Sequence, residues 1–97
     1  MNRTIYKYRL DNVRRQVLEL PRGHEVLKVD EQDGTLVLWA LVDVDEPKER
    51  VVLWIFGTGF CVPESLVLYH LGTVQMGQFV WHVFEDITEE YNYIESK

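Results

Sequence analysis

The sequence predicts an all-β domain, a small sandwich or partly open barrel of about seven antiparallel strands with a possible short C-terminal helix. Apolar and polar residues alternate with a period of two along most of the chain, which is typical of half-buried strands. Turn signals containing Gly or Pro recur about every eight to twelve residues, as in sandwiches and barrels. Aromatic residues, which favour strands, make up 12% of the chain. We expect residues 1–85 to form a single β domain and residues 86–97 an acidic tail or short helix.

The strands are expected in segments that begin at residues 3, 15, 25, 35, 50, 65 and 78, namely RTIYKYRL, RQVLEL, EVLKVDEQ, TLVLWALVDV, RVVLWIF, SLVLYHLGTVQ and QFVWHVFE. Asp33-Gly34 separates the third and fourth and is the strongest hairpin signal in the chain. Pro21 ends the second segment, and Met76-Gly77 separates the last two. Polar or glycine-containing stretches around Pro47 and Pro63 predict longer loops.

Two of these segments, TLVLWALV and VVLWIF, are apolar on both faces. A strand with two apolar faces is normally covered on both. Since the chain is short, we expect either tight barrel-like wrapping or a second subunit. The tryptophans of these segments, Trp39 and Trp54, are therefore candidate interface residues. Tyr6 and Tyr8 of the first strand join them, because a strand edge is a natural docking element.

The last segment, DITEEYNYIESK, changes its pattern from strand to helix. Asp86 and Glu89 have the spacing of a capping box. Ile87, Tyr91 and Ile94 fall at helical spacing, so we expect a helix from Ile87 to about Ser96. Its apolar stripe is expected to dock on the sheet of its own chain or, alternatively, on a partner.

Charge argues against general nucleic-acid binding, because the net charge is −6. Residues 1–22 nevertheless carry six Arg or Lys against two acidic residues, a balance of +4, so the remainder carries −10. This basic end could face an anionic partner, the acidic remainder of its own fold, or a second copy. The apolar runs are too short for a membrane helix, and no signal-peptide pattern is visible. The single cysteine, Cys61, can form no internal disulfide, so we expect a soluble cytoplasmic protein.

The stretch IFGTGF raises the main question about a site. Gly-Thr-Gly lacks the Lys and spacing of a P-loop, and no helix pattern follows it. It predicts a strand end where glycines permit a turn or bulge, with a small anion nest as the alternative. Gly-Thr recurs in LGTVQ, and two adjacent Gly-Thr corners could floor a shallow pocket. The candidate ligand-binding residues are Gly57, Thr58, Gly59, Gly72, Thr73, Gln75, Trp81 and His82.

No catalytic residue, metal ligand or cofactor is predicted. The sequence has no nucleophile elbow, and its three histidines lack zinc-site spacing. Cys61 lies between Phe60 and Val62, which predicts a small buried side chain. An enzyme would require His82 to lie next to a carboxylate and a nucleophile in space. We therefore expect a protein without enzymatic activity.

The motifs TIYKYRL, ELPRGHEVLKVDEQDGTLVLWALVD, IFGTG, YHLGTVQ and FVWHVFE resemble a family of short phage and prophage proteins of unknown function. The resemblance covers about residues 3–85. It departs at VDVDEPKE, where the family has a proline nearer to VD, and at the acidic tail after Glu85. It implies phage origin and a compact domain, but assigns no role to any residue. It also implies that the two Gly-Thr corners and Gln75 are shared features.

The sequence thus favours a non-enzymatic phage or prophage accessory protein that binds a host protein or forms a homo-oligomer. The alternative is a small-ligand or nucleotide-binding protein that uses the Gly-Thr corners and a stacking aromatic residue such as Trp81. Membrane association is not expected.

Overall fold

The computed structural model describes residues 2–96, which form seven antiparallel strands and one short helix. The all-β prediction is therefore confirmed. The elements are β1 (Arg3–Arg9), β2 (Arg15–Pro21), β3 (Glu25–Gln32), β4 (Thr35–Asp43), β5 (Lys48–Gly57), β6 (Leu68–Met76), β7 (Phe79–Asp86) and α1 (Thr88–Glu95).

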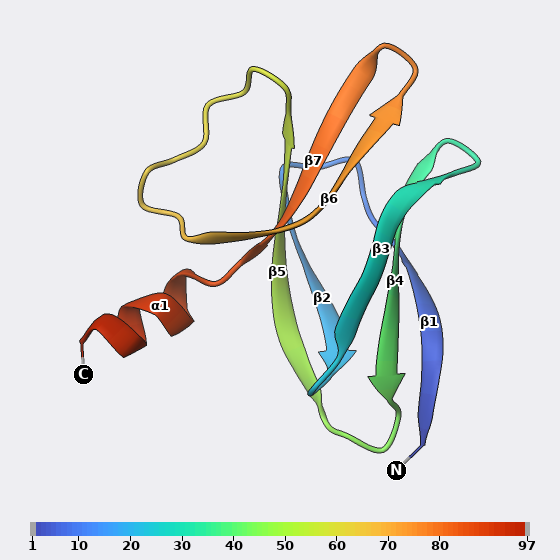
Figure 1. Cartoon of the computed structure of the whole chain (residues 1–97), viewed down its shortest axis with the longest axis vertical. Helices are drawn as coiled ribbons and strands as arrows, with labels where there is room; N and C mark the ends of the chain where they lie inside the picture. Colours follow the sequence, from blue (N-terminus) through green and yellow to red (C-terminus); the bar gives the residue numbers. More distant parts are fainter. Residues whose placement is uncertain (1, 97) are drawn as a thin grey trace.

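The strands form two open sheets, a three-stranded sheet of order β1-β4-β3 and a four-stranded sheet of order β2-β5-β7-β6 (Figure 1). Each doubly apolar strand lies inside a sheet, β4 between β1 and β3 and β5 between β2 and β7. At one side of the sandwich β3 packs against β6, where a Cβ on Gly72 would lie 3.1 Å from the Val29 Cβ. The other edge strands are β1 and β2, and neither has a second strand neighbour among residues 2–96.

The core lies between the inner faces of the two sheets. In β4 and β5 every second residue points into it, and Ala40 and Leu53 have no exposed surface. Val83 of β7 and Val74 of β6 complete the wall of the four-stranded sheet, and Leu20 enters from β2. Burial of such side chains is the main favourable term in folding.

The outer faces explain why β4 and β5 are apolar on both sides. Val37 and Phe56 point away from the core, yet only 1% and 2% of their surfaces are exposed. Phe56 is covered from within its own sheet, since Trp54 and Phe84 pack against it. Val37 lies between Arg9 and Asp30 in the register, and the aliphatic stem of Arg9 is long enough to cover it. A single chain therefore buries both residues without barrel closure or a second subunit.

The hairpin predicted at Asp33-Gly34 is present, with φ values of 53° and 80° at the two residues. Such a pair of positive φ angles matches the twist of the strands that it joins. Strand β6 begins at Leu68, later than the sequence predicted, and residues 58–67 form a long loop. Cys61 lies in this loop and is exposed. The prediction that it is buried is wrong, because its apolar neighbours Phe60 and Val62 are also largely exposed.

The C-terminal helix is present but begins differently from the prediction. Ile87 occupies the N-cap position and no side chain caps the helix, so the predicted capping box is absent. Asp86 lies one position earlier, and its Oδ1 accepts a hydrogen bond of 2.9 Å from the Thr88 backbone N–H. This bond forms a turn before the helix.

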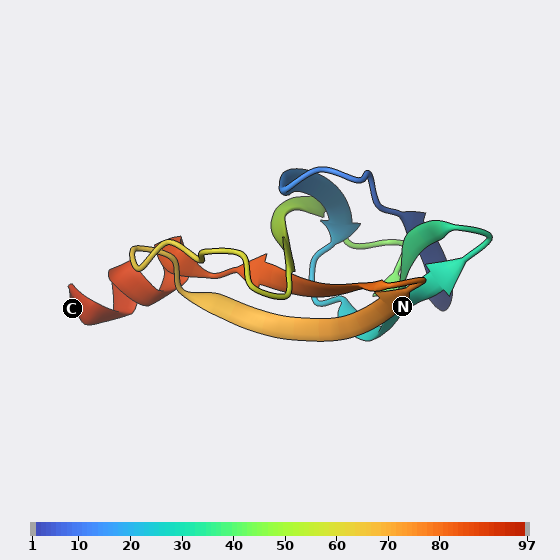
Figure 2. The same cartoon turned by 90° about the horizontal axis from the view of Figure 1, so that it is seen from above.

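The apolar stripe of α1 does not dock on the sandwich. No residue of α1 is buried, and Tyr91 and Ile94 are 46% and 69% exposed. The helix extends away from both sheets (Figures 1 and 2). The expectation that the stripe packs on the sheet of its own chain is therefore wrong. No helix within residues 2–96 has the length and apolar character needed to cross a membrane.

Candidate functional site

His82 joins the two Gly-Thr corners on the outer face of the four-stranded sheet. Its Nε2 lies 2.8 Å from the Thr58 Oγ1, and its Nδ1 lies 3.0 Å from the Thr73 Oγ1. Strand register explains this meeting, because His82 is opposite Thr73 in β6 and opposite Phe56, two residues before Thr58, in β5. The structure thus brings together two corners that are 15 residues apart in the sequence.

The hydrogen-bonded chain continues to a second histidine. The Thr73 Oγ1 also lies 2.9 Å from the His70 Nε2. A hydroxyl has one proton to donate and can accept from a second partner, so Thr73 can link the two imidazoles. Both ring nitrogens of His82 are already engaged. A ligand at this place would have to displace an existing hydrogen bond, so the corners offer little unused hydrogen-bonding capacity.

Aromatic rings extend the same outer face toward the helix. Trp54 and Phe56 stack with a centroid distance of 5.8 Å, and Phe84 meets Phe56 edge-on at 6.2 Å. His70 lies 5.2 Å from the Phe84 ring centroid. The Trp54 Nε1–H donates to the Asp86 Oδ2 at 2.8 Å. This bond fixes the orientation of the indole.

The environment of Asp86 changes its acidity. Desolvation raises the pKa of its carboxyl group, but hydrogen bonds from Thr88 and Trp54, together with the charge of Arg15, outweigh that effect. The net result is a lowered pKa, so the carboxylate is held in its charged form at the junction between β7 and α1.

Trp81 lies on the opposite side of β7 from His82, because successive residues of a strand alternate between faces. It stacks with Phe79 at 5.9 Å and meets Phe60 edge-on at 6.1 Å. The Arg14 guanidinium lies 5.5 Å from the Phe60 ring centroid. Trp81 therefore cannot stack on a ligand held by the Gly-Thr corners.

This arrangement answers the question raised by IFGTGF. A Cβ on Gly57 would lie 2.9 Å from the Phe60 Cε1 and 3.2 Å from the Trp81 Cζ3. Gly57 is therefore required for the close approach of two rings to the strand. Gly59 has a φ of 89° and turns the chain back, with the Phe60 N–H bonded to the Gly57 carbonyl. The stretch is a strand end that packs aromatic rings.

The other candidate residues are dispersed. The Gln75 amide bonds the Gly77 carbonyl at 3.3 Å within the β6–β7 hairpin, and Gly72 allows the contact between β6 and β3. Among the interface candidates, Tyr6 is 46% exposed, whereas Tyr8 packs against the core.

Trp39 and Trp54 lie on the outer faces of different sheets, at opposite sides of the molecule. The four interface candidates therefore do not form one surface.

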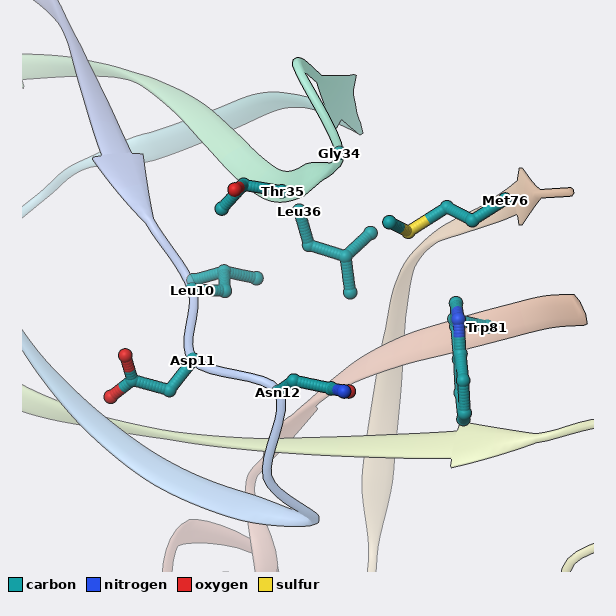
Figure 3. Close-up of a pocket in the computed structure, with 8 residues that line it drawn as sticks. All are labelled: Leu10, Asp11, Asn12, Gly34, Thr35, Leu36, Met76 and Trp81. Carbon is teal, nitrogen blue, oxygen red and sulfur yellow. The ribbon is translucent and has the colours of Figure 1, made fainter.

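Sequence reasoning missed a pocket of about 280 Å³ at the end of the sandwich. It lies between the link from β1 to β2, the β3–β4 turn and the β6–β7 hairpin, and Leu10, Leu36, Met76 and Trp81 form its apolar wall (Figure 3). The sequence shows LDN only as a short connection, and nothing in it indicates that these residues face Trp81. The inward phase of Trp81 in β7 follows from alternation, but it does not indicate which connections face this side chain.

A second pocket missed by the sequence, of about 300 Å³, lies between β3 and the β6–β7 pair and includes His24, His70 and Glu85. Desolvation raises the pKa of the Glu85 carboxyl group, opposed by the nearby His24 and reinforced by Glu90 and Glu49. His24 Nδ1 lies 3.0 Å from the Pro21 carbonyl oxygen. Within residues 2–96 no group of three or more His, Cys, Asp or Glu side chains has the arrangement of a metal site.

The chain matches one known protein family. The model of a domain of unknown function, DUF7352, matches residues 1–93. The chain belongs to this family. No curated protein and no solved structure matches the chain. The DUF7352 match includes both sheets and most of α1, so the helix is part of the family's domain.

Proposed function

We propose that this domain acts without catalysis, as a protein-binding domain that associates with further copies of itself. In this association, helix α1 of one copy docks against the basic edge strand β1 of the next. The observation that carries the proposal is the position of α1, which extends from the sandwich and buries none of its residues.

Helix α1 has the composition of a docking element. Tyr91 and Ile94 expose apolar surface, and Glu89, Glu90 and Glu95 give the helix its charge. A helix of eight residues is marginal in water unless its apolar side is covered. Covering Tyr91 and Ile94 with a partner would supply the missing stabilisation.

Strand β1 offers a complementary surface. It is an edge strand, so the backbone groups on its outer side have no strand partner among residues 2–96. Its outer-facing side chains are Arg3, Ile5, Lys7 and Arg9, and Ile5 is 57% exposed. No carboxylate within 2–96 forms an ion pair with Arg9. An exposed apolar side chain between cations suits an acidic helix with apolar anchors.

The charges of β1 and α1 favour contact between these two elements over pairing of two β1 strands. Pairing two β1 edges would bring like charges together, which is how edge strands commonly avoid self-pairing. Contact between α1 and β1 joins opposite charges instead. This interface is heterologous, because it uses different surfaces of the two copies, and such contacts build rings or open filaments.

We place this association in a phage or prophage setting, in the cytoplasm of the host. The support for that setting is the resemblance of the motifs to short phage proteins. A host protein with an acidic, apolar helix could occupy the same edge of β1, and the experiment below separates it from a second copy.

The first test measures the mass of the purified full chain by light scattering, from about 5 to 500 µM. We expect mass to increase with concentration and to fall at high salt, since screening weakens exposed charge pairs. The double variant Tyr91→Ser/Ile94→Ser should be monomeric, because loss of buried apolar anchors typically costs about 2 kcal/mol or more. Glu64→Lys, which changes charge on the 58–67 loop, is the control and should associate like the wild type. A wild-type monomer at every concentration would refute self-association.

A charge exchange tests the surfaces themselves. Lys7→Glu/Arg9→Glu and Glu89→Lys/Glu90→Lys should each associate poorly alone. When mixed, they should co-assemble in a one-to-one ratio, because both surfaces of one variant then face surfaces of opposite charge on the other. Failure of the mixture, with both variants folded, would exclude this pairing of surfaces.

A further inference from the structure

A small-molecule site is indicated at the end of the sandwich, where Trp81 separates two adjoining depressions. The first, of about 280 Å³, lies beside Leu10, Leu36 and Met76. The second, of about 230 Å³, lies beside Arg14 and Phe60. Asn12 and Trp81 line both, so the two depressions share a wall. Each alone is smaller than a typical ligand pocket, and together they offer room for a small organic molecule.

The first depression is suited to an apolar ring. Leu10 and Leu36 point into it, and the indole of Trp81 presents its face from the other side (Figure 3). Met76 approaches from the β6–β7 hairpin, and a thioether adapts well to flat rings. Leu10 and Leu36 are only 4% and 6% exposed, so these walls are held by the core.

Polar groups at the same place have unused hydrogen-bonding capacity. The amide of Asn12 points toward Trp81, and the carboxylate of Asp11 points away from the cavity (Figure 3). Neither the Asn12 amide nor the Trp81 Nε1–H has a hydrogen-bond partner within residues 2–96. The backbone N–H and carbonyl of Asp11 are both bound by the Gln16 amide, at 2.9 and 2.8 Å, which fixes this wall. His82 and its threonines differ, because their polar atoms already satisfy each other.

The second depression supplies a cation. Arg14 lies over the Phe60 ring, and no carboxylate among residues 2–96 forms an ion pair with it. Trp81 lines both depressions, whereas Arg14 and Phe60 line only the second. The guanidinium and the apolar cavity therefore lie on different sides of the indole. Arg is well suited to bind carboxylate or phosphate through two parallel hydrogen bonds.

We propose that this site binds a flat heteroaromatic ring that carries an anionic substituent. The ring occupies the cavity against Trp81, with Asn12 bonded to a polar ring edge, and the anion reaches Arg14. Both an aromatic carboxylate and a nucleoside monophosphate have this chemistry, and the proposal is independent of the self-association proposed above.

The test uses the full chain and follows the three tryptophan indole N–H signals by NMR, with that of Trp81 assigned from Trp81→Phe. The probes are indole-3-carboxylate, adenosine 5′-monophosphate, adenosine and inorganic phosphate, each up to 5 mM. We expect at least one anionic ring compound to shift the Trp81 signal saturably, while Trp39 and Trp54 stay in place. Comparison of the first two probes identifies the source of the anion. The neutral ring should bind more weakly, and phosphate alone should not move Trp81.

Variants then separate ring binding from anion binding. Arg14→Gln should weaken the anionic probe about tenfold, as expected for loss of a charge-assisted hydrogen bond, and leave adenosine within about twofold. Asn12→Ala should weaken both. Arg22→Gln, at an exposed site paired with Glu46, is the matched control and should change neither. Absence of any shift at Trp81, a shift of Trp54 in its place, or an equal effect of Arg22→Gln would overturn the proposal.

Discussion

Replacing Gly57 with alanine should destabilise the domain through one identifiable contact. The added Cβ would lie 2.9 Å from the Phe60 Cε1, 3.1 Å from its Cζ and 3.2 Å from the Trp81 Cζ3. Since real Cβ atoms do not approach to 2.9 Å, at least one ring must move. Overpacking of this kind costs about 1–3 kcal/mol. The lower entropy of the unfolded alanine chain returns about 0.4–1 kcal/mol. We expect a net loss of about 1 kcal/mol in the free energy of unfolding.

The same change in a Phe60→Ala background isolates the cause. Removing the Phe60 ring eliminates the two closest contacts, whereas the entropic gain of alanine remains. Gly57→Ala should then be nearly neutral. Urea denaturation followed by tryptophan fluorescence measures all four members of this double-mutant cycle. Gly72→Ala is a matched control, because its Cβ would meet Val29 at 3.1 Å, and its cost should not depend on Phe60. An equal cost of Gly57→Ala in both backgrounds would refute the reasoning.

Three further predictions follow from the core, the β7–α1 junction and the 58–67 loop. Leu53→Ala should lower the free energy of unfolding by about 2–5 kcal/mol, because Leu53 has no exposed surface. Val17→Ala, on edge strand β2, is the control and should cost less than about 1 kcal/mol. Equal losses of the two variants in urea titrations would contradict this prediction. Asp86→Asn should reduce the free energy of unfolding at pH 7, because folding lowers the pKa of the Asp86 carboxyl group. The stability that Asp86 contributes is present above its unfolded pKa of 3.8 and is lost as the pH falls through its folded pKa. The stabilities of wild type and variant, measured against pH, should therefore converge in acid, and a constant difference would argue against this prediction. Cys61 should react with a thiol reagent in the folded protein about as fast as in denaturant, since it is exposed, and protection until unfolding would show that the loop covers it.

The sequence predicted the strands well because their signals are local. Alternation in β1 and β7, and the Asp33-Gly34 turn, depend on residues that are neighbours in the chain. The start of β6 differs from the prediction, because Leu66 and Val67 continue the apolar pattern although the chain there is still a loop. For the same reason Cys61 was expected to be buried, since flanking apolar residues do not reveal that a loop points outward.

The site depended on partners that local patterns cannot supply. The meeting of Thr58 and Thr73 on His82 requires the pairing of β5 with β7 and of β7 with β6. The separation of Trp81 from His82 follows from simple alternation along the strand, which the sequence does show. The pocket beside Asn12 could not, because it needs three connections from distant parts of the chain. Helix α1 was predicted from its periodicity, but the sequence does not encode where its stripe packs.

The sheet order also determines how the chain can fold during synthesis. Strands β1 and β2 are made first, yet their partners are β4 and β5, and Arg3 pairs with Asp43 while Arg15 pairs with Trp54. Neither early strand can form its ladder until the central strands have left the ribosome. Such long-range pairing is typical of slow-folding β proteins. The six positive charges of residues 1–22 favour hydration of β1 and β2 and oppose their premature pairing with each other until β4 and β5 have been synthesised.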